Sequence, residues 1–456
     1  MICEISREEL DNYYERSAKK INTDSYYDPE LFSKYNVKRG LRNEDGTGVV
    51  VGLTEIGDVQ SYIMDGDRKI PLEGRLIYRG IDVYDLVNAC MSEDRFGFEE
   101  CAYLLLFGEL PTREQLDEFN AVLACNRSLP DGFVRDIIMK APSINIMNKL
   151  ARCVLVEYSY DPNQEDTSVK NLFRQSMELI ARMPLLAAYA YQAKSHYHDG
   201  NSLYIHRPRE ELSTAENILC LSRPDCSYTR LEATTLDTAL ILHAEHGGGN
   251  NSTFTSHVVA STGTDIYSCI AASLGSLKGP KHGGANLKVM EMMAEIKENV
   301  KNWNDDGEIR DYLVRILNKE AYDNSGLIYG LGHAVYTLSD PRCVLLKKKA
   351  KELAKEKGRS EEFQLYEKIE LLGPEVFNEL KRTNKPMCAN VDFYSGFVYD
   401  MLNIPKDLYT SLFAIARIVG LCAHIIEEVT RNGRIIRPAY RNVGEAKKYI
   451  PLDMRK

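Results

Sequence analysis

The sequence predicts an all-α, multihelical protein with a minor β element near the N-terminus. Helix-start signals recur along the whole chain, whereas strand-like patterns are confined to residues 49–78. The sequence has no fixed-period repeat and no low-complexity segment, which disfavours a solenoid.

Four segments have a Ser or Thr followed three residues later by Glu or Gln. With this spacing the two side chains cap the free amides at a helix start. The four pairs are Ser6 with Glu9, Thr112 with Gln115, Ser213 with Glu216, and Thr229 with Glu232. After Thr112, the apolar residues Leu116, Phe119, Val122 and Leu123 recur on one helical face. We therefore expect an amphipathic helix after each cap.

The strand signal is made of short apolar runs around a turn. Residues 50–51, 62–64 and 76–78 are rich in β-branched and aromatic side chains, and Asp65-Gly66 lies between the second and third runs. These runs predict the minor β element.

Length and charge limit the class of protein. The 456 residues allow about three domains, or one large and one small domain. The net charge of -9 lacks the positive surface of a nucleic-acid-binding protein, so any anionic ligand must meet local positive charge.

Cysteine usage and the apolar stretches indicate a location. The 11 cysteines are scattered without a C-x-x-C pair, which favours reduced thiols in a cytosol. The N-terminal segment lacks the apolar core of a signal peptide. The most apolar stretch, residues 411–426, is too short for a bilayer and contains Arg417 and His424. We expect a cytoplasmic protein that does not enter a membrane.

Four proton-transferring side chains lie in glycine-containing segments: His246, His282, His333 and Asp392. Imidazole and carboxylate groups exchange protons near neutral pH, and glycine allows close approach of backbone to ligand. The set predicts an active site.

Residues 229–246 read as a helix that Gly247 ends, with His243 and His246 on one face. Three interpretations remain open: a metal-binding pair, a pair that caps its own helix C-terminus, or ligand binding by His246. The H-x-x-H spacing lacks the Glu of H-E-x-x-H and has no nearby Cys, which disfavours zinc.

His282 lies in a Gly-Pro turn before an expected helix, where the positive end of the helix dipole favours a neutral imidazole. Such a group donates a hydrogen bond to a developing oxyanion; a solvent-exposed turn histidine is the alternative.

Asp392 lies between Val391 and Phe393, where burial would raise its pKa and make it a better base. The alternative for Asp392 is a helix N-cap.

The run Gly330-Leu331-Gly332-His333 lacks the third glycine of a dinucleotide fingerprint, and no stretch matches a P-loop.

Arg342, Arg417 and Arg437 are candidates for binding carboxylates, which suit the planar guanidinium. For Arg417, which interrupts an apolar helix, extension to the surface is the alternative. The lysines of residues 347–351 could neutralise phosphates, although a solvated helix face is more usual.

Together these segments resemble the citrate synthase family. The resemblance covers nearly the whole chain, from Gly74-Arg75-Leu76-Ile77-Tyr78-Arg79-Gly80 through Gly108-Glu109-Leu110-Pro111-Thr112 to Arg437-Pro438. The order of His246, His282, residues 333–342, Asp392, Arg417 and Arg437 also matches the family.

The resemblance implies a multihelical two-domain homodimer. A large domain would comprise residues 1–286 and 398–456, and a small domain, residues 287–397, would close over the active site. The family's reaction condenses acetyl-CoA with oxaloacetate and water to citrate and CoA, without a metal or a resident cofactor.

The resemblance also implies roles for single residues. His282, His333 and Asp392 would be catalytic. His246, Arg342 and Arg417 would bind oxaloacetate, and Arg437 would reach the site of the partner subunit. Residues 327–333 resemble the segment that recognises adenine.

One departure from the family concerns coenzyme A. Where many members have Lys or Arg four residues after the histidine of residue 333, this chain has Thr337. Three alternatives stay open: a 2-methylcitrate synthase using propionyl-CoA, a non-catalytic helical scaffold, and a metal-dependent hydrolase. One methylene group changes discrimination by only about 1 to 3 kcal/mol, so no motif separates the two acyl-CoA substrates.

Overall fold

The computed structural model describes residues 6–22, 28–43, 45–66, 68–332, 335–431, 433–444 and 446–455. The described chain forms two compact units, residues 1–52 with 437–456 and residues 53–436. The division at 287–397 expected from the family resemblance is a different one and stays a prediction.

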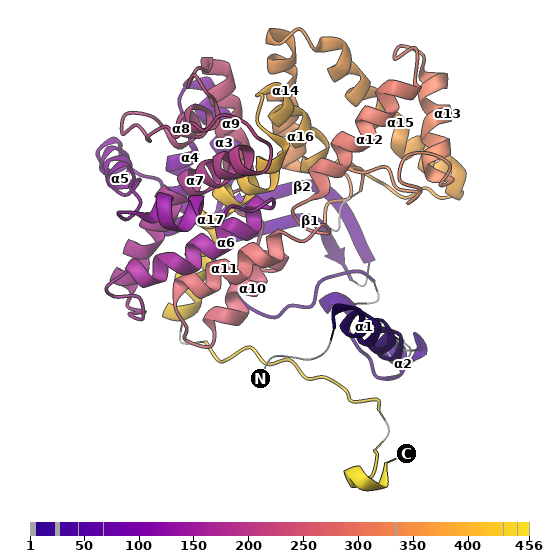
Figure 1. Ribbon diagram of the computed structural model, residues 1–456. Coiled ribbons are helices and arrows are strands. Elements are labelled where there is room, and N and C mark those ends of the chain that lie inside the picture. The colour runs from indigo at the N-terminus through magenta and orange to yellow at the C-terminus, as the bar shows by residue number, and fades with distance from the viewer. Residues whose placement is uncertain are drawn as a thin grey trace. The chain divides into compact units, whose positions relative to one another are not determined.

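Helices make up most of the described chain (Figure 1). The first unit contains α1 (Arg7–Asn22), α2 (Glu30–Lys34), η1 (Arg39–Leu41) and η5 (Leu452–Met454). The long helices of the second unit are α3 (Val83–Ser92), α4 (Phe98–Phe107), α5 (Arg113–Cys125), α6 (Ile146–Glu157), α7 (Val169–Tyr197), α8 (Thr214–Ser222), α9 (Arg230–His243), α10 (Asn251–Ala260), α11 (Ile266–Leu277), α12 (Ala285–Asn299), α13 (Asp306–Leu317), α14 (Pro341–Glu356), α15 (Ser360–Lys381), α16 (Val391–Met401) and α17 (Tyr409–Thr430). Its short helices are η2 (Val134–Met139), η3 (Tyr158–Tyr160) and η4 (Lys406–Leu408). The predicted helical fold class is confirmed.

All four predicted capping pairs form. In each, the Ser or Thr oxygen accepts the backbone N–H three residues on, and the Glu or Gln side chain accepts the N–H of the capping residue. The apolar face predicted for α5 includes one residue too many. Phe119 and Leu123 are buried as expected, whereas the Val122 side chain is 40% exposed. Only the Phe119 side of α5 is covered by the protein.

The β element is a three-stranded antiparallel sheet in the order β1 (Gly57–Asp65), β2 (Arg68–Tyr78) and β3 (Ile81–Asp82). Asp65 pairs with Arg68 across the predicted turn. The expectation that residues 50–51 form a strand is wrong: Val50 is 86% exposed, and this segment has no strand to pair with among the described residues.

The core of the second unit is organised around α17. This helix packs against α4, α7, α9, α10 and α11, and every residue from Ser411 to Ile425 is buried. Figure 1 shows α12, α13, α15 and α16 as a neighbouring group, within which α12 contacts α16 and α13 contacts α15. α14 contacts both α16 and α9, and so connects this group to the helices around α17. Among the described residues, no helix combines the length and apolar composition needed to cross a bilayer.

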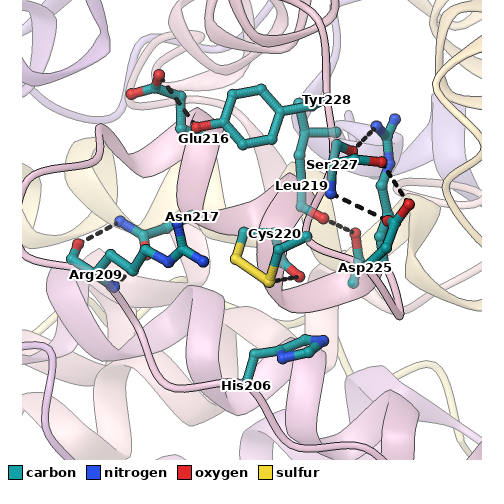
Figure 2. Close-up of a disulfide and its surroundings, with 12 residues drawn as sticks. His206, Arg209, Glu216, Asn217, Leu219, Cys220, Asp225, Ser227 and Tyr228 are labelled. Carbon is teal, nitrogen blue, oxygen red and sulfur yellow. Dashed lines mark hydrogen bonds between the residues drawn. A yellow bond between two sulfur atoms is a disulfide. The ribbon is translucent and has the colours of Figure 1, made fainter.

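The expectation of reduced thiols is wrong for one pair of cysteines. A disulfide joins Cys220, near the end of α8, to Cys226 (Figure 2). Between them the chain turns back on itself, and Cys226 has a left-handed backbone with φ of 53°. The Ser227 hydroxyl donates to Asp225 within the same turn. Sequence spacing gave no sign of this turn. The other described cysteines are free.

The contribution of the Ser213 cap to the stability of the protein can be tested by substitution. Ser213→Ala should lower the free energy of unfolding by about 1 kcal/mol, because the N–H of Glu216 loses its acceptor. Ser213→Thr keeps the hydroxyl and serves as the control. Urea unfolding followed by circular dichroism measures both, and equal stability of the two variants would contradict the capping role.

Candidate active site

Asp392 lies in the first turn of α16. The side chain of Asn390 caps this helix by accepting the N–H of Asp392 at 3.0 Å, so the interpretation of Asp392 as the N-cap is wrong. Asp392 remains partly exposed between the buried Val391 and Phe393. Burial raises the pKa of the Asp392 carboxyl to about 6, against the opposing effect of the Arg342 guanidinium. The direction agrees with the sequence prediction.

The loop that ends at Gly332 is hydrogen-bonded to the segment before Asp392. The N–H of Gly332 donates to the carbonyl of Cys388, and the Asn390 side chain donates to the carbonyl of Gly332 at 2.9 Å. Gly330 has a φ of 82°, and a Cβ there would lie 2.7 Å from the Phe393 ring. Only glycine fits so closely. These contacts fix the residue that precedes His333, while His333 itself lies outside the described residues.

Arg342 lies at the start of α14, buried beside Asp392. Its Nε and Nη2 donate to the two carboxylate oxygens of Asp340 at 3.0 and 2.8 Å. Both side chains are almost fully buried, with exposures of 4% for Arg342 and 0% for Asp340. Asp340 also caps α14 and accepts the N–H of Val391. One carboxylate therefore orients the arginine and ties α14 to α16.

His246 lies beyond the end of α9 instead of on its face. The helix ends at His243, so the expectation that His243 and His246 share a helical face is wrong. After the helix has ended, Gly247 takes a left-handed backbone with φ of 81° in the turn that follows His246. The His246 ring packs edge-on against the Tyr336 ring, with centroids 5.6 Å apart. The Arg342 guanidinium lies 5.9 Å from the same Tyr336 ring.

His282 occupies the predicted turn before α12. Its Nε2 accepts the backbone N–H of Ser252 at 3.3 Å, which places the proton of a neutral ring on Nδ1. Burial, followed by the positive charge of Arg417, lowers the pKa of His282 to about 4. The imidazole is therefore neutral near pH 7, as the sequence predicted, but burial is the main cause.

Arg417 is 0% exposed in the middle of α17, so the interpretation in which it reaches the surface is wrong. Its Nε donates to the carbonyl of His243 at 2.8 Å, and its guanidinium packs on the Phe413 ring. Neither Nη atom has a hydrogen-bond partner among the described residues. Burial lowers the pKa of Arg417 to about 10, which leaves it charged at neutral pH. Two buried donors on a cation suit a carboxylate ligand.

These side chains act on one another electrostatically. The positive charge of Arg342 acts to lower the pKa of Asp392, and that of Arg417 lowers the pKa of His282. After burial, which is the main cause, both arginines also lower the pKa of His243. Arg437 is exposed and belongs to the other unit. Lys347 of α14 binds Glu370 of α15 at 2.7 Å instead of facing this region. Among the described residues, no group of three His, Cys, Asp or Glu side chains could hold a metal ion.

Sequence reasoning missed several supporting residues. Asp340 could have been found, because Asp-Pro is a common start of a helix. Tyr336 and Ser252 gave no comparable signal, since their contacts join segments that are distant in sequence.

Comparisons with known proteins identify the family. Residues 43–439 match the family described as citrate synthase, C-terminal domain. The chain is 33% identical over 425 residues to a citrate synthase of Haloferax volcanii, with 92% of this chain and 99% of the relative covered. It is also 33% identical over 429 residues to 2-methylcitrate synthase 1 of Corynebacterium glutamicum, covering 93% and 100%.

A solved structure agrees with these relatives. The citrate synthase of Thermoplasma acidophilum, in ternary complex with carboxymethyl coenzyme A and oxaloacetate, superposes on this chain with a TM-score of 0.75 and 27% identity, with 92% of this chain and 99% of that chain covered. The chain belongs to the citrate synthase family, whose condensing enzymes use acyl-CoA as a substrate and need no resident cofactor.

The two buried arginines provide a stability test in the unliganded protein. Arg342→Met should lower the free energy of unfolding by about 3–5 kcal/mol, because it leaves Asp340 buried and unpaired. Arg417→Met should change it by no more than about 1 kcal/mol, because the bond to the His243 carbonyl is lost while the Met side chain can still pack on the Phe413 ring. Urea unfolding measures both variants. An equally large loss for Arg417→Met would show that its guanidinium is already satisfied by the protein.

Proposed function

We propose that this chain is a citrate synthase, which condenses acetyl-CoA with oxaloacetate and water to give citrate and CoA. The observation that carries the proposal is the environment of Asp392, a partly exposed carboxylate with a pKa near 6 beside a buried arginine. Such a carboxylate is ionised at pH 7 and is a stronger base than one in water.

In the first step Asp392 takes a proton from the methyl carbon of the thioester. Negative charge then develops on the thioester oxygen, where His282 donates its Nδ1–H. The contact with Ser252 supports this role, because it occupies Nε2 and leaves Nδ1 protonated. A preorganised donor of this kind contributes about 100-fold or more to the rate.

In the second step the enol carbon attacks the ketone of oxaloacetate, and a C–C bond forms. His333 donates a proton to the ketone oxygen, and water then cleaves the citryl thioester to release CoA. His246, Arg342 and Arg417 hold the carboxylates of oxaloacetate. The unpartnered Nη atoms of Arg417 support this assignment.

The remaining family features belong to the same proposal. Residues 287–397 would close over the substrates and exclude water until condensation is complete. Arg437 would complete the site of the partner subunit in a cytoplasmic homodimer that acts in the tricarboxylic acid cycle.

Removal of the proposed base tests the mechanism. Asp392→Asn should lower kcat at least about 100-fold, because the amide cannot accept the methyl proton. Release of free CoA thiol measures the rate. Asp400→Asn is the matched control near the other end of the same helix, where Asp400 pairs with Arg359 at 2.7 Å, and it should keep the wild-type kcat.

The wild-type pH profile adds a second criterion for Asp392. Because the pKa is raised, the carboxylate is protonated below about pH 6, and kcat/KM should fall with decreasing pH there. Near wild-type turnover of Asp392→Asn, or a rate independent of pH between 5 and 7, would refute the base assignment.

A 2-methylcitrate synthase remains the second candidate, because two relatives with that name are 31% and 33% identical to this chain, within the range of 31% to 35% found for citrate synthases. Thiol release with oxaloacetate and either acetyl-CoA or propionyl-CoA separates the two. We expect a higher kcat/KM for acetyl-CoA. A higher value for propionyl-CoA would assign the second activity, and no thiol release with either would refute both.

A further inference from the structure

Two histidines that take no part in the proposed chemistry are in contact between α10 and α17. His257 Nε2 lies 3.2 Å from His424 Nδ1, and the two rings meet nearly edge to face with centroids 5.0 Å apart. At the outer end, His257 Nδ1 lies 2.7 Å from the carboxylate of Glu428. At the inner end, His424 Nε2 lies 3.0 Å from the carboxylate of Glu245. The four side chains form a continuous hydrogen-bonded row.

The inner end of this row holds the turn that carries His246. Glu245 and His424 are both 0% exposed, and the oxygen of Glu245 that meets His424 also accepts the N–H of Gly247. A Cβ on Gly57 would come within 2.8 Å of the Glu245 side chain, and one on Gly420 within 2.4 Å. The carboxylate is therefore enclosed and has little freedom to change orientation.

The row has a defined proton requirement. Its three links each need one N–H, but two neutral imidazoles supply only two. All three links form with N–H donors only when one of the two rings is protonated, so that the imidazolium pair lies between the carboxylates of Glu245 and Glu428. Burial, followed by the neighbouring His424, lowers the pKa of His257. The extra proton therefore binds mainly below neutral pH.

Further charged groups face the pair from each neighbouring segment. They are Glu427 and Arg431 from α17 and its end, Glu55 from the segment before β1, and Arg79 from the turn after β2. Arg431 binds Glu427 at 2.9 Å, so the charge of this carboxylate is already balanced by a guanidinium. Glu245 and Glu428 remain the carboxylates in hydrogen-bond contact with the two rings.

We infer that His257 is a positioning residue: through His424 and Glu245 it fixes the turn at residues 245–249 and so orients His246 toward a substrate carboxylate. The inference rests on the proposed function, in which His246 binds oxaloacetate. It assigns a role to a side chain of α10 that contacts no substrate. Gly248 lies against both rings, since a Cβ there would be 3.5 Å from His257 and 3.6 Å from His424.

Binding of oxaloacetate alone, measured by isothermal titration calorimetry at pH 7, tests this role without requiring turnover. His257→Leu should raise the Kd about tenfold, the effect expected for loss of one supporting hydrogen bond. His257→Gln should restore most of the affinity, because its amide nitrogen can take the place of Nε2. His198→Leu, an exposed histidine outside the row, should bind like the wild type.

A role in packing alone would not change the pH dependence. Because protonation completes the row only when His257 is present, the ratio of the His257→Gln Kd to the wild-type Kd should rise as the pH falls from 8 to 5.5. Should His257→Leu fail to fold, Glu428→Gln replaces it, since it removes only the outer charge and should raise the Kd severalfold at pH 5.5.

The outcomes separate the two claims. Wild-type protein that does not bind oxaloacetate overturns the proposed function. Wild-type binding with an unchanged Kd in His257→Leu, or in Glu428→Gln where that variant replaces it, overturns the positioning role alone. A ratio of Kd values that stays constant with pH also overturns it.

Discussion

The structure depends on the burial of two guanidinium groups in a mostly apolar interior. Removing a charge from water costs several kcal/mol unless a partner replaces the lost solvation. Arg342 has such a partner in Asp340, whereas the two Nη atoms of Arg417 have none among the described residues. The site is therefore built around positive charge that the protein itself leaves partly uncompensated, and a dicarboxylate substrate is the natural complement.

The same charge distribution explains the states of the neighbouring acid and base. Arg417 helps to keep His282 neutral, and Arg342 opposes the upward shift of the Asp392 pKa without cancelling it. Because Asp340 caps α14, pairs with Arg342 and accepts the N–H of Val391, a single buried carboxylate fixes the arginine relative to the helix that carries Asp392. Backbone bonds between residues 330–332 and 388–390 fix the same region from the other side.

Local signals predicted much of the fold, because caps and apolar periodicity act within a few residues. All four capping pairs formed, and the turn at Asp65-Gly66 was found. The misses have physical causes: Val50 lacks a partner strand, α9 stops three residues before His246, and the Cys220–Cys226 disulfide depends on a turn without a clear sequence signature. In the site, residue types and family resemblance proposed the candidates, but Ser252, Tyr336 and the His257 row depend on contacts between distant segments that one sequence does not reveal.

The most direct measurement is a crystal structure of the protein with oxaloacetate and carboxymethyl coenzyme A bound. We expect a carboxylate of oxaloacetate about 3 Å from both Nη atoms of Arg417, with Asp392 and His282 facing the carboxymethyl group. Oxaloacetate bound away from Arg417, or Asp392 directed away from the coenzyme in the closed complex, would contradict the assignment of this site.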